Sequence, residues 1–424
     1  MSSLFHSYLC GRKAAEWLIK MKECINIGLI GYGQRGTYLL RDTLLHRTDI
    51  HILAVCDAYE DRAIAAQQVI AEEKGYTPFA TVNYKEILAM QQVGAVLVTS
   101  SWAGHIQIAI DAMEAGKYVG IEVGGAYSVD ECWQLVHAYE RTKIPCMMME
   151  NCCYGRNELL ILNMVRQGLF GEVVHCQGGY KHDLRDEISK GEELRHYRLS
   201  NYKNRNCENY PTHELGPISR VLNINRGNRL VSLSSFASKA AGLHDYLVRK
   251  NESESDPDKL QFTQGDVVTT VLKCAHGETI TLTLDTTLPR PYSRGLHIQG
   301  TRGLYQEDNQ SVFLDGTHNQ FHEDWKGHWG NVEEYYAQYD HPIWKKYLED
   351  GVMPGHGGMD WLVCNAFFDA VANGTNTPID VYDIAAWMCV TPLSEASIAM
   401  GGMPVAIPDF TNGRWINRKA EGDL

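Results

Sequence analysis

The chain has 424 residues, of which 44% are hydrophobic and 21% charged, so it can form more than one hydrophobic core and does not have the composition of a disordered or fibrous protein. Its formal net charge of -13 is unfavourable for binding nucleic acid, which depends on clustered Lys and Arg. No apolar run reaches the length of about eighteen residues that a membrane span needs, and charges interrupt the first twenty positions, so we expect no membrane partner, no signal peptide and a cytoplasmic protein.

Residues 1–20 match none of the patterns that follow them. We predict that the folded domain begins near Met21 and that residues 1–20 are an N-terminal extension. The extension either contains a short helix around Ala14–Ile19 or precedes the true start of the protein at Met21.

From Ile25 to Asn151, short apolar runs alternate with stretches of helical periodicity. The runs are INIGLI, HILAVCD, AVLVTSS, YVGIEV and PCMMMEN, and the helices between them are expected at Arg35–Leu45, Ile64–Glu73, Ile106–Ala115 and Val129–Thr142. Continuous apolar strands separated by helices are typical of a parallel sheet covered on both faces. We therefore predict an α/β protein whose residues 21–151 form a doubly wound Rossmann domain.

The pattern changes after residue 151. A helix is expected at Asn157–Gln167, followed by the alternating strands VVHCQGGY, RLVSLSSF, DVVTTVLKCA and ETITLTLDT, by polar loops at Arg185–Asn209 and Asn251–Gln264, and by a helix at Met359–Asn373. A period of two predicts a sheet with one covered face. Residues 152–424 are therefore expected to form an α+β domain with an open, mostly antiparallel sheet.

Three glycines form a GxGxxG motif, Gly31, Gly33 and Gly36, between the first strand and the first helix. Glycine permits a tight turn close to a pyrophosphate, which the N–H groups at the helix N-terminus bind. Asp57 ends the second strand about twenty residues further on, where it can accept hydrogen bonds from ribose hydroxyls and would repel the extra phosphate of NADP. The alternative is a glycine turn that binds nothing, and we predict an NAD site.

Polar side chains also follow the later strands of this domain. Trp102 and His105 follow the third, Glu122 and Val123 the fourth, and Asn151 the fifth. They are expected at the carboxyl edge of the sheet, where cofactors lie. Many sugar dehydrogenases of this architecture have a proton-handling lysine directly after that glutamate. Val123 stands there instead, which weakens the case for an ordinary alcohol dehydrogenase.

Tyrosine, histidine and arginine residues cluster in the second predicted domain. The candidates are Tyr180, His196, Arg198, Tyr210, Pro211, Thr212, His213 and Tyr292. Phenols and imidazoles can transfer protons and planar side chains stack on sugar rings, so this set suits a carbohydrate, although each residue taken singly could belong to the core. His213 is the strongest catalytic candidate because imidazole titrates near neutrality and because Pro211 and Gly216 constrain its turn.

The twelve cysteines show no framework spacing, and several lie within apolar runs, which is typical of reduced, buried thiols. His182 and Asp183 could begin a metal-ligand set, but no third ligand accompanies them. We therefore predict neither disulfides nor a metal site.

Long motifs between about Asn26 and Trp415 resemble a known family. They include EV at Glu122, MENCCYGRNE from Met149, NMVRQGLFGEVVHCQGGYKHDLR from Asn163, YPTHELGPI from Tyr210, LPRPYSRGLHIQGTRG from Leu288, GHGGMDWL from Gly355, VYDIAAWMCVTPLSEASIA from Val381 and VAIPDFTNGRW from Val405. On these residues the chain resembles the glucose–fructose oxidoreductase (Gfo/Idh/MocA) superfamily and, within it, glycoside hydrolase family 109, the NAD-dependent α-N-acetylgalactosaminidases.

The resemblance implies functions for the residues at matching positions. Cofactor contacts would fall on Gln34, Arg35, Asp57, Trp102 to His105, Glu122, Val123 and Asn151. Substrate contacts would fall on Tyr180, Arg198, Tyr210, Pro211, Thr212, His213 and Tyr292. Ala103, Gly104, Asn201 and Met148 depart from residues that are common in the family, and these differences leave the exact sugar open.

The family implies a redox-assisted glycosidase. Our hypothesis is that bound NAD takes a hydride from C3 of the sugar, that the ketone acidifies the C2 proton so that the C1 substituent is eliminated, and that water addition and return of the hydride complete the cycle. His213 and His196 are the candidates for moving protons, with Tyr180 and Tyr210 supporting them. The resemblance also implies a homo-oligomer, either a dimer or a tetramer.

Two other functions stay open. One is an NAD-dependent sugar or inositol dehydrogenase that releases NADH. The other is a sensor that binds NAD and sugar without turnover.

Overall fold

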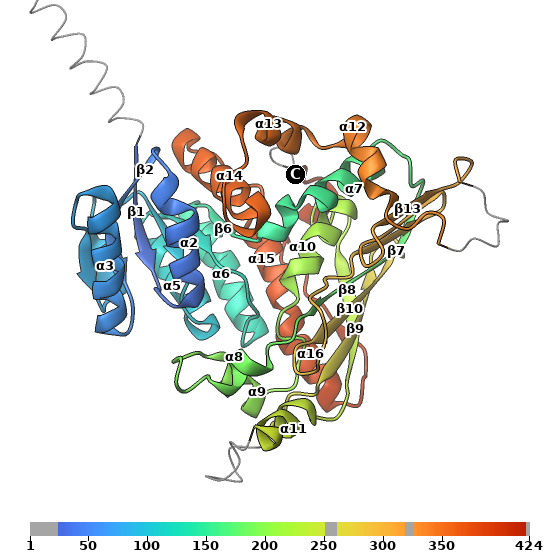
Figure 1. Ribbon diagram of the computed structural model, residues 1–424, viewed down its shortest axis with the longest axis horizontal. Coiled ribbons are helices and arrows are strands. Elements are labelled where there is room, and N and C mark those ends of the chain that lie inside the picture. The colour runs from blue at the N-terminus through green and yellow to red at the C-terminus, as the bar shows by residue number, and fades with distance from the viewer. Residues whose placement is uncertain (1–23, 251–260, 319–325, 421–424) are drawn as a thin grey trace, which may run out of the picture.

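The computed structural model describes residues 24–250, 261–318 and 326–420, which form two sheets with helices between and around them (Figure 1). The expected extension at residues 1–20 and most of the predicted loop at Asn251–Gln264 lie outside the described residues. The division into domains after Asn151 stays a prediction.

The first sheet has six strands within the described residues, all parallel, in the order β3-β2-β1-β4-β5-β6. The strands are β1 (Ile25–Ile30), β2 (Ile50–Cys56), β3 (Phe79–Thr81), β4 (Ala95–Val98), β5 (Tyr118–Ile121) and β6 (Cys146–Met148). β4 is buried along its whole length, as expected for a sheet covered on both faces. The doubly wound fold is confirmed, and its strand order reverses at β1, where such sheets open a crevice at their carboxyl ends.

The four helices predicted for this part are all present, but most of them begin or end at other residues than predicted. They are α2 (Gln34–Asp42), η1 (Leu44–His46), α3 (Glu60–Lys74), α4 (Tyr84–Ala89), α5 (Trp102–Glu114) and α6 (Val129–Thr142). α6 begins where predicted because Ser128 and Glu131 form a capping box. α5 begins earlier than predicted, so Trp102 and His105 lie on a helix. The prediction missed β3, whose three residues include no buried side chain, and α4 after it.

The second sheet has eight strands in the described residues, in the order β13-β12-β11-β7-β10-β9-β8-β14. The strands are β7 (Val173–Lys181), β8 (Leu230–Ala237), β9 (Val267–Cys274), β10 (Thr279–Asp285), β11 (His297–Gly300), β12 (Gly303–Gln306), β13 (Ser311–Leu314) and β14 (Val405–Ala406). Only β7 and β10 pair in parallel, so the prediction of an open, mostly antiparallel sheet is confirmed. β11, β12 and β13 were not predicted because each has only four residues.

The remaining helices of the described residues follow β6 along the chain. They are η2 (Asn151–Tyr154), α7 (Arg156–Arg166), α8 (Arg185–Ser189), α9 (Arg198–Asn204), α10 (Thr212–Val221), α11 (Gly242–Arg249), η5 (Asn331–Tyr335), α12 (Tyr336–Tyr339), α13 (Pro342–Asp350), η6 (His356–Gly358), α14 (Met359–Asn373), α15 (Val381–Met388), α16 (Val390–Ala399) and η7 (Arg414–Ile416). α10 packs on β7 and α16 on β8, while β9 buries every second residue. The prediction of one polar loop over Arg185–Asn209 is wrong, because Ile188 and Tyr202 are fully buried and anchor α8 and α9.

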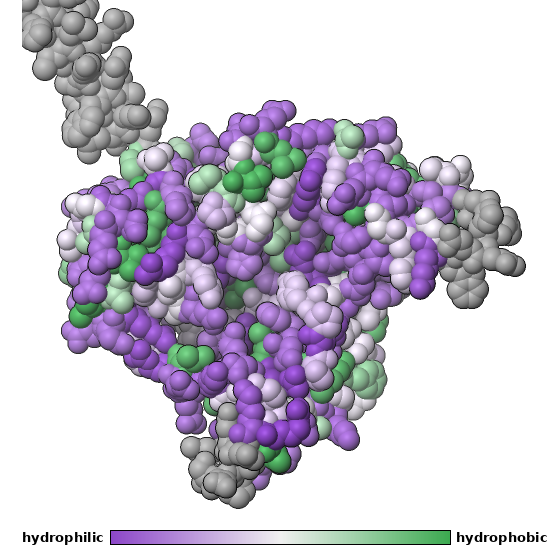
Figure 2. Space-filling model, in the orientation of Figure 1, coloured by the Kyte–Doolittle hydropathy of each residue, from purple (hydrophilic) through white to green (hydrophobic). Residues whose placement is uncertain are grey.

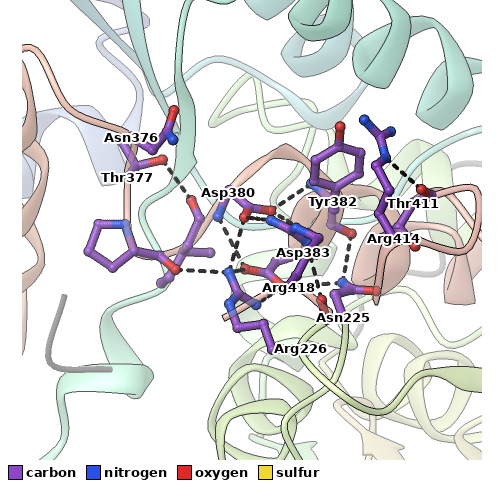
Figure 3. Close-up of polar contacts among 12 residues, drawn as sticks. Asn225, Arg226, Asn376, Thr377, Asp380, Tyr382, Asp383, Thr411, Arg414 and Arg418 are labelled. Carbon is purple, nitrogen blue, oxygen red and sulfur yellow. Dashed lines mark hydrogen bonds and ion pairs between the residues drawn. The ribbon is translucent and has the colours of Figure 1, made fainter. Parts of the chain in front are cut away.

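The helices α10, α14 and α15 fill the middle of the molecule, between the two sheets (Figure 1). α15 packs against α6 and β6 of the first sheet and also against α10. At its N-terminus, Asp383 is completely buried and binds Arg226 through Nη1–Oδ1 (2.7 Å) and Nη2–Oδ2 (2.8 Å) (Figure 3). Asp383 also lies 3.2 Å from Arg220, so one carboxylate joins α15 to α10 and to the turn that follows it.

None of the helices in the described ranges is long and apolar enough to span a membrane. The eleven cysteines of these ranges are all free thiols, and ten of them are buried.

Candidate active site

A cavity of about 1540 Å³ lies between the carboxyl ends of the first sheet and the segment that follows β7. Its walls are the glycine turn after β1, the ends of β2, β4 and β5, residues 186–198, and side chains at the end of β7 and the start of α10. Figure 2 shows the surface hollowed between the two parts of the molecule. Since a small-ligand site usually occupies roughly 300–1,000 Å³, this cavity can hold a dinucleotide together with a second ligand.

Most residues predicted for the site line this cavity. They are Gly31, Gly33, Gln34, Arg35, Asp57, His105, Glu122, Val123, Asn151, Tyr180, His196, Arg198, Tyr210 and His213. The predicted residues that do not line it are Gly36, Trp102, Pro211, Thr212 and Tyr292. The fold therefore brings most of the predicted segments to one cavity, and the contacts of each side chain are described below.

The glycine turn has the geometry that a dinucleotide needs. Gly31 has φ +107°, and a Cβ there would lie 2.6 Å from the backbone nitrogen of Ser100. A Cβ on Gly36 would lie 2.3 Å from the carbonyl oxygen of Gly31, so this glycine allows α2 to pack against β1. At Gly33 a Cβ would meet only Arg62, at 3.7 Å, and would otherwise enter open space. The residues present fit a bound pyrophosphate.

Asp57 holds this turn in place. Its two carboxylate oxygens accept hydrogen bonds from the backbone N–H groups of Tyr32 (2.7 Å) and Tyr59 (2.9 Å). The predicted role was to bind ribose hydroxyls. Each oxygen keeps a second lone pair, so the carboxylate can do both.

Arg35, which also lines the cavity, connects two buried carboxylates. Its Nε donates to Glu122 at 2.8 Å, and Nη1 and Nη2 donate to Asp360 at 2.8 and 2.9 Å. Asp360, at the start of α14, also accepts from the side chain of Asn151 (2.8 Å) and lies 2.7 Å from Nδ1 of His356. Hydrogen bonds from His356 and Arg35 outweigh burial and hold the pKa of Asp360 far below its usual range.

The lysine typical of dehydrogenases is absent beside Glu122. Val123 follows this glutamate, and Arg35 neutralises the carboxylate. Burial raises the pKa of Glu122, against the lowering effect of Arg35. His105 provides no replacement base, because burial lowers its pKa to about 4 and its Nε2 donates to the carbonyl of Ser100 at 2.7 Å.

His213 lies in the first turn of α10 and is paired with a buried glutamate. Its Nδ1 is 2.7 Å from Oε1 of Glu150, a residue with no exposed surface. Burial alone would raise the pKa of Glu150, but the charge and hydrogen bond of His213 keep it below its ordinary value. The carboxylate fixes the orientation of the ring and leaves Nε2 for the cavity.

Arg198 is buried and enclosed by aromatic rings. Its guanidinium carbon lies 5.2 Å from the ring centre of Trp102, 5.1 Å from that of Tyr210 and 6.0 Å from that of Tyr180. Its Nη1 has no hydrogen-bond partner among the described residues. Because a buried donor left unpaired costs about 1–3 kcal/mol, this group is well suited to bind an oxygen of a ligand.

Tyr180 and Tyr210 form one wall next to His213. Their rings are 4.2 Å apart, and the ring of His213 lies 4.9 Å from Tyr210 and 5.6 Å from Tyr180. Burial raises the pKa of both phenols, so they stay protonated at neutral pH and act as hydrogen-bond donors. Tyr292 is half exposed, with its ring 6.3 Å from Tyr180, and therefore lies nearer the solvent.

His196 is less suited to proton transfer than predicted from sequence. Burial lowers its pKa to about 4, its Nδ1 accepts the N–H of Arg198 at 3.2 Å, and its ring stacks on Tyr197 at 4.6 Å. These contacts favour a role in shaping the segment 186–198. That segment reaches the first sheet's helices, because Arg62 donates to the carbonyl of Leu194 at 2.7 Å.

Three side chains that sequence reasoning did not propose contribute to the site: Glu150, Asp360 and His356. Glu150 lies within the motif MENCCYGRNE and Asp360 within the motif GHGGMDWL. These motifs were the signal in the sequence that could have identified the two residues. Their partners are 63 and 209 positions away, so no local pattern reveals the pairing.

Glu150 and His213, together with Cys152, also present ligand atoms within 4.8 Å of one another, a group that could hold a metal ion where none was predicted. The hydrogen bond between His213 and Glu150 already explains their approach.

Comparisons with known proteins agree with this geometry. The family model "Oxidoreductase family, NAD-binding Rossmann fold" matches residues 25–150, and "Glycosyl hydrolase 109, C-terminal domain" matches residues 154–417. A glycosyl hydrolase family 109 protein of Stenotrophomonas maltophilia is 38% identical over 93% of this chain and 91% of its own length. The chain belongs to glycosyl hydrolase family 109. It is thus an NAD-dependent enzyme of a glycosidase family.

Two other family 109 relatives have more specific names. A protein of Tannerella forsythia, 39% identical over 94% of this chain and 89% of its own length, is named alpha-N-acetylgalactosaminidase. One from Shewanella oneidensis with the same name is 36% identical over 97% of this chain and 90% of its own.

Two solved structures that are similar in fold are dehydrogenases. Levoglucosan dehydrogenase in complex with NADH and levoglucosan has a TM-score of 0.66 at 18% identity, covering 91% of this chain and 100% of that one. myo-Inositol 2-dehydrogenase of Lactobacillus plantarum has a TM-score of 0.63 at 15% identity, covering 91% and 99%. At these identities the likeness shows the fold alone.

Proposed function

We propose that this family 109 enzyme hydrolyses α-N-acetylgalactosaminides or closely related glycosides by an oxidation that is reversed within each turnover. The names of two relatives support the substrate class. The arrangement of Arg198 and His213 supports it most directly. A buried guanidinium whose Nη1 has no hydrogen-bond partner among the described residues, and whose Nε lies 3.1 Å from Glu187, lines the same cavity as the glycine turn and the carboxylate-bound imidazole of His213.

The residues that would hold the cofactor are those of the first sheet's carboxyl edge. Gly31 allows the tight turn, Gly33 leaves room for the pyrophosphate, Asp57 would face the ribose, and Arg35 and Asn151 also line the cavity. When bound there, the nicotinamide would supply the reversible removal of a hydride from C3 of the sugar.

The chain's own residues would bind the sugar and move its protons. Arg198, Tyr180 and Tyr210 donate hydrogen bonds to sugar oxygens. Because the ketone at C3 acidifies the neighbouring C–H, a base of ordinary strength can remove the C2 proton, and Nε2 of His213 accepts it while Glu150 stabilises the imidazolium. Loss of the C1 substituent and addition of water at C1 follow, and His213 returns the proton to C2.

The missing lysine beside Glu122 favours this function over a simple sugar dehydrogenase, whose fold the chain shares. Measurement in deuterated water separates the two, with 4-nitrophenyl α-N-acetylgalactosaminide as substrate. We expect release of nitrophenol, deuterium at C2 of the product and no accumulation of NADH. NADH accumulation without nitrophenol release would establish a dehydrogenase instead, and no reaction on a panel of sugars would favour a sensor.

The variant His213→Ala tests the assignment of the base. We expect turnover and C2 exchange to fall by about 100-fold or more while the NAD content stays unchanged. Retained activity would exclude His213.

A further inference from the structure

A short segment after α8, residues 190–197, forms a strap along one wall of the cavity. All eight of its residues line the cavity, which the glycine turn and Asp57 line as well. The strap is anchored at both ends, because Ile188 before it and Arg198 after it are buried. In Figure 1 the loop beside α8 extends toward the helices of the first sheet. The strap is therefore part of the boundary of the space assigned to the dinucleotide.

The middle of the strap is bound to the first turn of α3. Arg195 donates two hydrogen bonds to the carboxylate of Asp61, Nη1 to Oδ1 at 2.9 Å and Nη2 to Oδ2 at 2.7 Å. Next to this pair, Nη2 of Arg62 donates to the carbonyl of Leu194 at 2.7 Å. Two consecutive residues of the strap thus contact two consecutive residues of α3, which connects the strap to the nucleotide-binding part of the molecule.

These contacts lie next to the positions expected for the ribose and the pyrophosphate. The guanidinium carbons of Arg195 and Arg62 lie 4.4 and 5.1 Å from the ring centre of Tyr59, whose N–H donates to Asp57. A Cβ added at Gly33 would meet Nη1 of Arg62 at 3.7 Å. A dinucleotide that extends from Gly33 to Asp57 would therefore lie under the contacts between the strap and α3.

The contacts with α3 are weaker than the anchors of the strap. Asp61 is 66% exposed and Arg195 37% exposed, and water competes effectively for ion pairs as exposed as this one. Arg195 also has φ +50°, an unfavourable conformation for arginine that the ion pair helps to maintain. At the buried end, the ring of Tyr197 packs 4.7 Å from that of Trp102. The strap can thus open locally between its anchors without unfolding the rest of the molecule.

We propose that the strap is a gate for the dinucleotide and that the ion pair of Asp61 with Arg195 is its latch. The nucleotide enters and leaves when the strap separates from α3, and it is retained while the pair is closed. The inference rests on the NAD site and not on the glycosidase reaction. It adds to the proposed function, because a cofactor that is restored in each turnover can stay bound, whereas a dehydrogenase has to release NADH.

Reversing the charges of the latch tests the gate. The holoenzyme is loaded with radiolabelled NAD, excess unlabelled NAD is added without any sugar, and the label that stays on the protein is followed with time. Arg195→Asp and Asp61→Arg should each raise the dissociation rate about five- to tenfold, because each replaces an attraction by a repulsion. The double variant Asp61→Arg/Arg195→Asp restores a pair of opposite charges, and its rate should return to within about twofold of the wild type.

The variant Asp61→Arg separates a latch from a direct attraction of the phosphates. It adds positive charge next to the pyrophosphate position, so a purely electrostatic effect on the nucleotide would slow dissociation, whereas an opened latch speeds it. The matched control is Arg249→Asp, which changes the net charge as Arg195→Asp does and breaks an exposed pair with Asp245 on α11. Its dissociation rate should equal that of the wild type.

A gate also controls entry. Binding of NADH to the full chain freed of nucleotide, followed by the fluorescence of NADH, gives the association rate. Since opening precedes both entry and exit, each single variant should raise the two rates by similar factors and leave Kd within about threefold. A side chain that only contacts the nucleotide would change dissociation and Kd without raising the association rate.

Unchanged dissociation in both single variants, slower dissociation in Asp61→Arg, or a double variant as fast as the singles would overturn the gate. Melting temperatures equal to that of the wild type exclude partial unfolding as the cause. If a charge reversal lowers the melting temperature, Asp61→Asn removes the pair without repulsion and should still raise the dissociation rate about two- to fivefold. Because no sugar is present, these outcomes do not depend on whether the enzyme cleaves glycosides, so the proposed function and the gate can fail separately.

Discussion

Glu150 is the single residue on which the proton chemistry of the site depends most. It is fully buried, and besides His213 its Oε1 accepts only the N–H of Cys152, at 3.1 Å, among the described residues. A carboxylate in this position holds one tautomer of the imidazole and stabilises its charged form. In the proposed mechanism, proton transfer by His213 therefore depends on the pair and not on the histidine alone.

We predict that Glu150→Gln lowers kcat by about 100-fold or more and leaves KM within a few-fold, because the amide can fill the space of the carboxylate but cannot stabilise the imidazolium. Steady-state kinetics between pH 5 and pH 9 would measure both effects.

The control is Glu158→Gln, which changes another buried carboxylate, one that pairs with Arg294 and bonds no histidine. Its kcat and pH profile should stay close to those of the wild type. A similar loss in both variants would mean that Glu150 acts only through stability.

At the scale of an element, the turn from β1 into α2 makes different demands on its glycines. We predict that Gly33→Ala folds normally but weakens NAD binding by tenfold or more, because its Cβ would meet only Arg62, at 3.7 Å, and would otherwise project into the space for the pyrophosphate. Gly36→Ala should instead lose stability, since its Cβ would lie 2.3 Å from the carbonyl of Gly31. Thermal melting with and without NAD distinguishes the two.

Unchanged NAD affinity in Gly33→Ala would show that this turn does not hold the cofactor. A wild-type melting temperature in Gly36→Ala would show that Gly36 is not required for packing. Each variant therefore serves as the other's control, since both add one methyl group to the same turn.

Elements with local signals were predictable from the sequence, and those that depend on tertiary contacts were not. The glycine turn, the capping box of α6 and the alternation of β10 each lie within a few consecutive residues. α8 and α9 lack such a pattern, because single buried residues such as Ile188 and Tyr202 stabilise them against the rest of the molecule. In the site, the segments were found by motif, but the pairing of Asp360 with Arg35 spans 325 positions and could only be seen in the fold.

At the scale of the whole molecule, the C-terminal helices hold the two sheets together, and Asp383 is the centre of that arrangement. It is fully buried at the start of α15, which packs on the first sheet. It binds Arg226 (Figure 3) and also Arg220, which lies on α10, a helix that packs on β7 of the second sheet. Burial would raise the pKa of Asp383, but these guanidinium groups hold it well below its usual value.

We predict that Asp383→Asn destabilises the protein by about 3–5 kcal/mol at pH 7, because it removes the buried carboxylate that pairs with Arg220 and one of the two, with Asp380, that pair with Arg226. The pKa of Asp383 is lower in the folded than in the unfolded state, so its contribution is complete above the ordinary aspartate pKa of about 4 and decreases as the pH falls below it. The difference in melting temperature between wild type and variant should thus be constant from pH 5 to pH 8 and become smaller below pH 4. The exposed pair of Asp245 with Arg249 provides the control, since Asp245→Asn should cost less than about 1 kcal/mol. A difference that stayed constant down to pH 3 would mean that Asp383 contributes through packing and not through its charge.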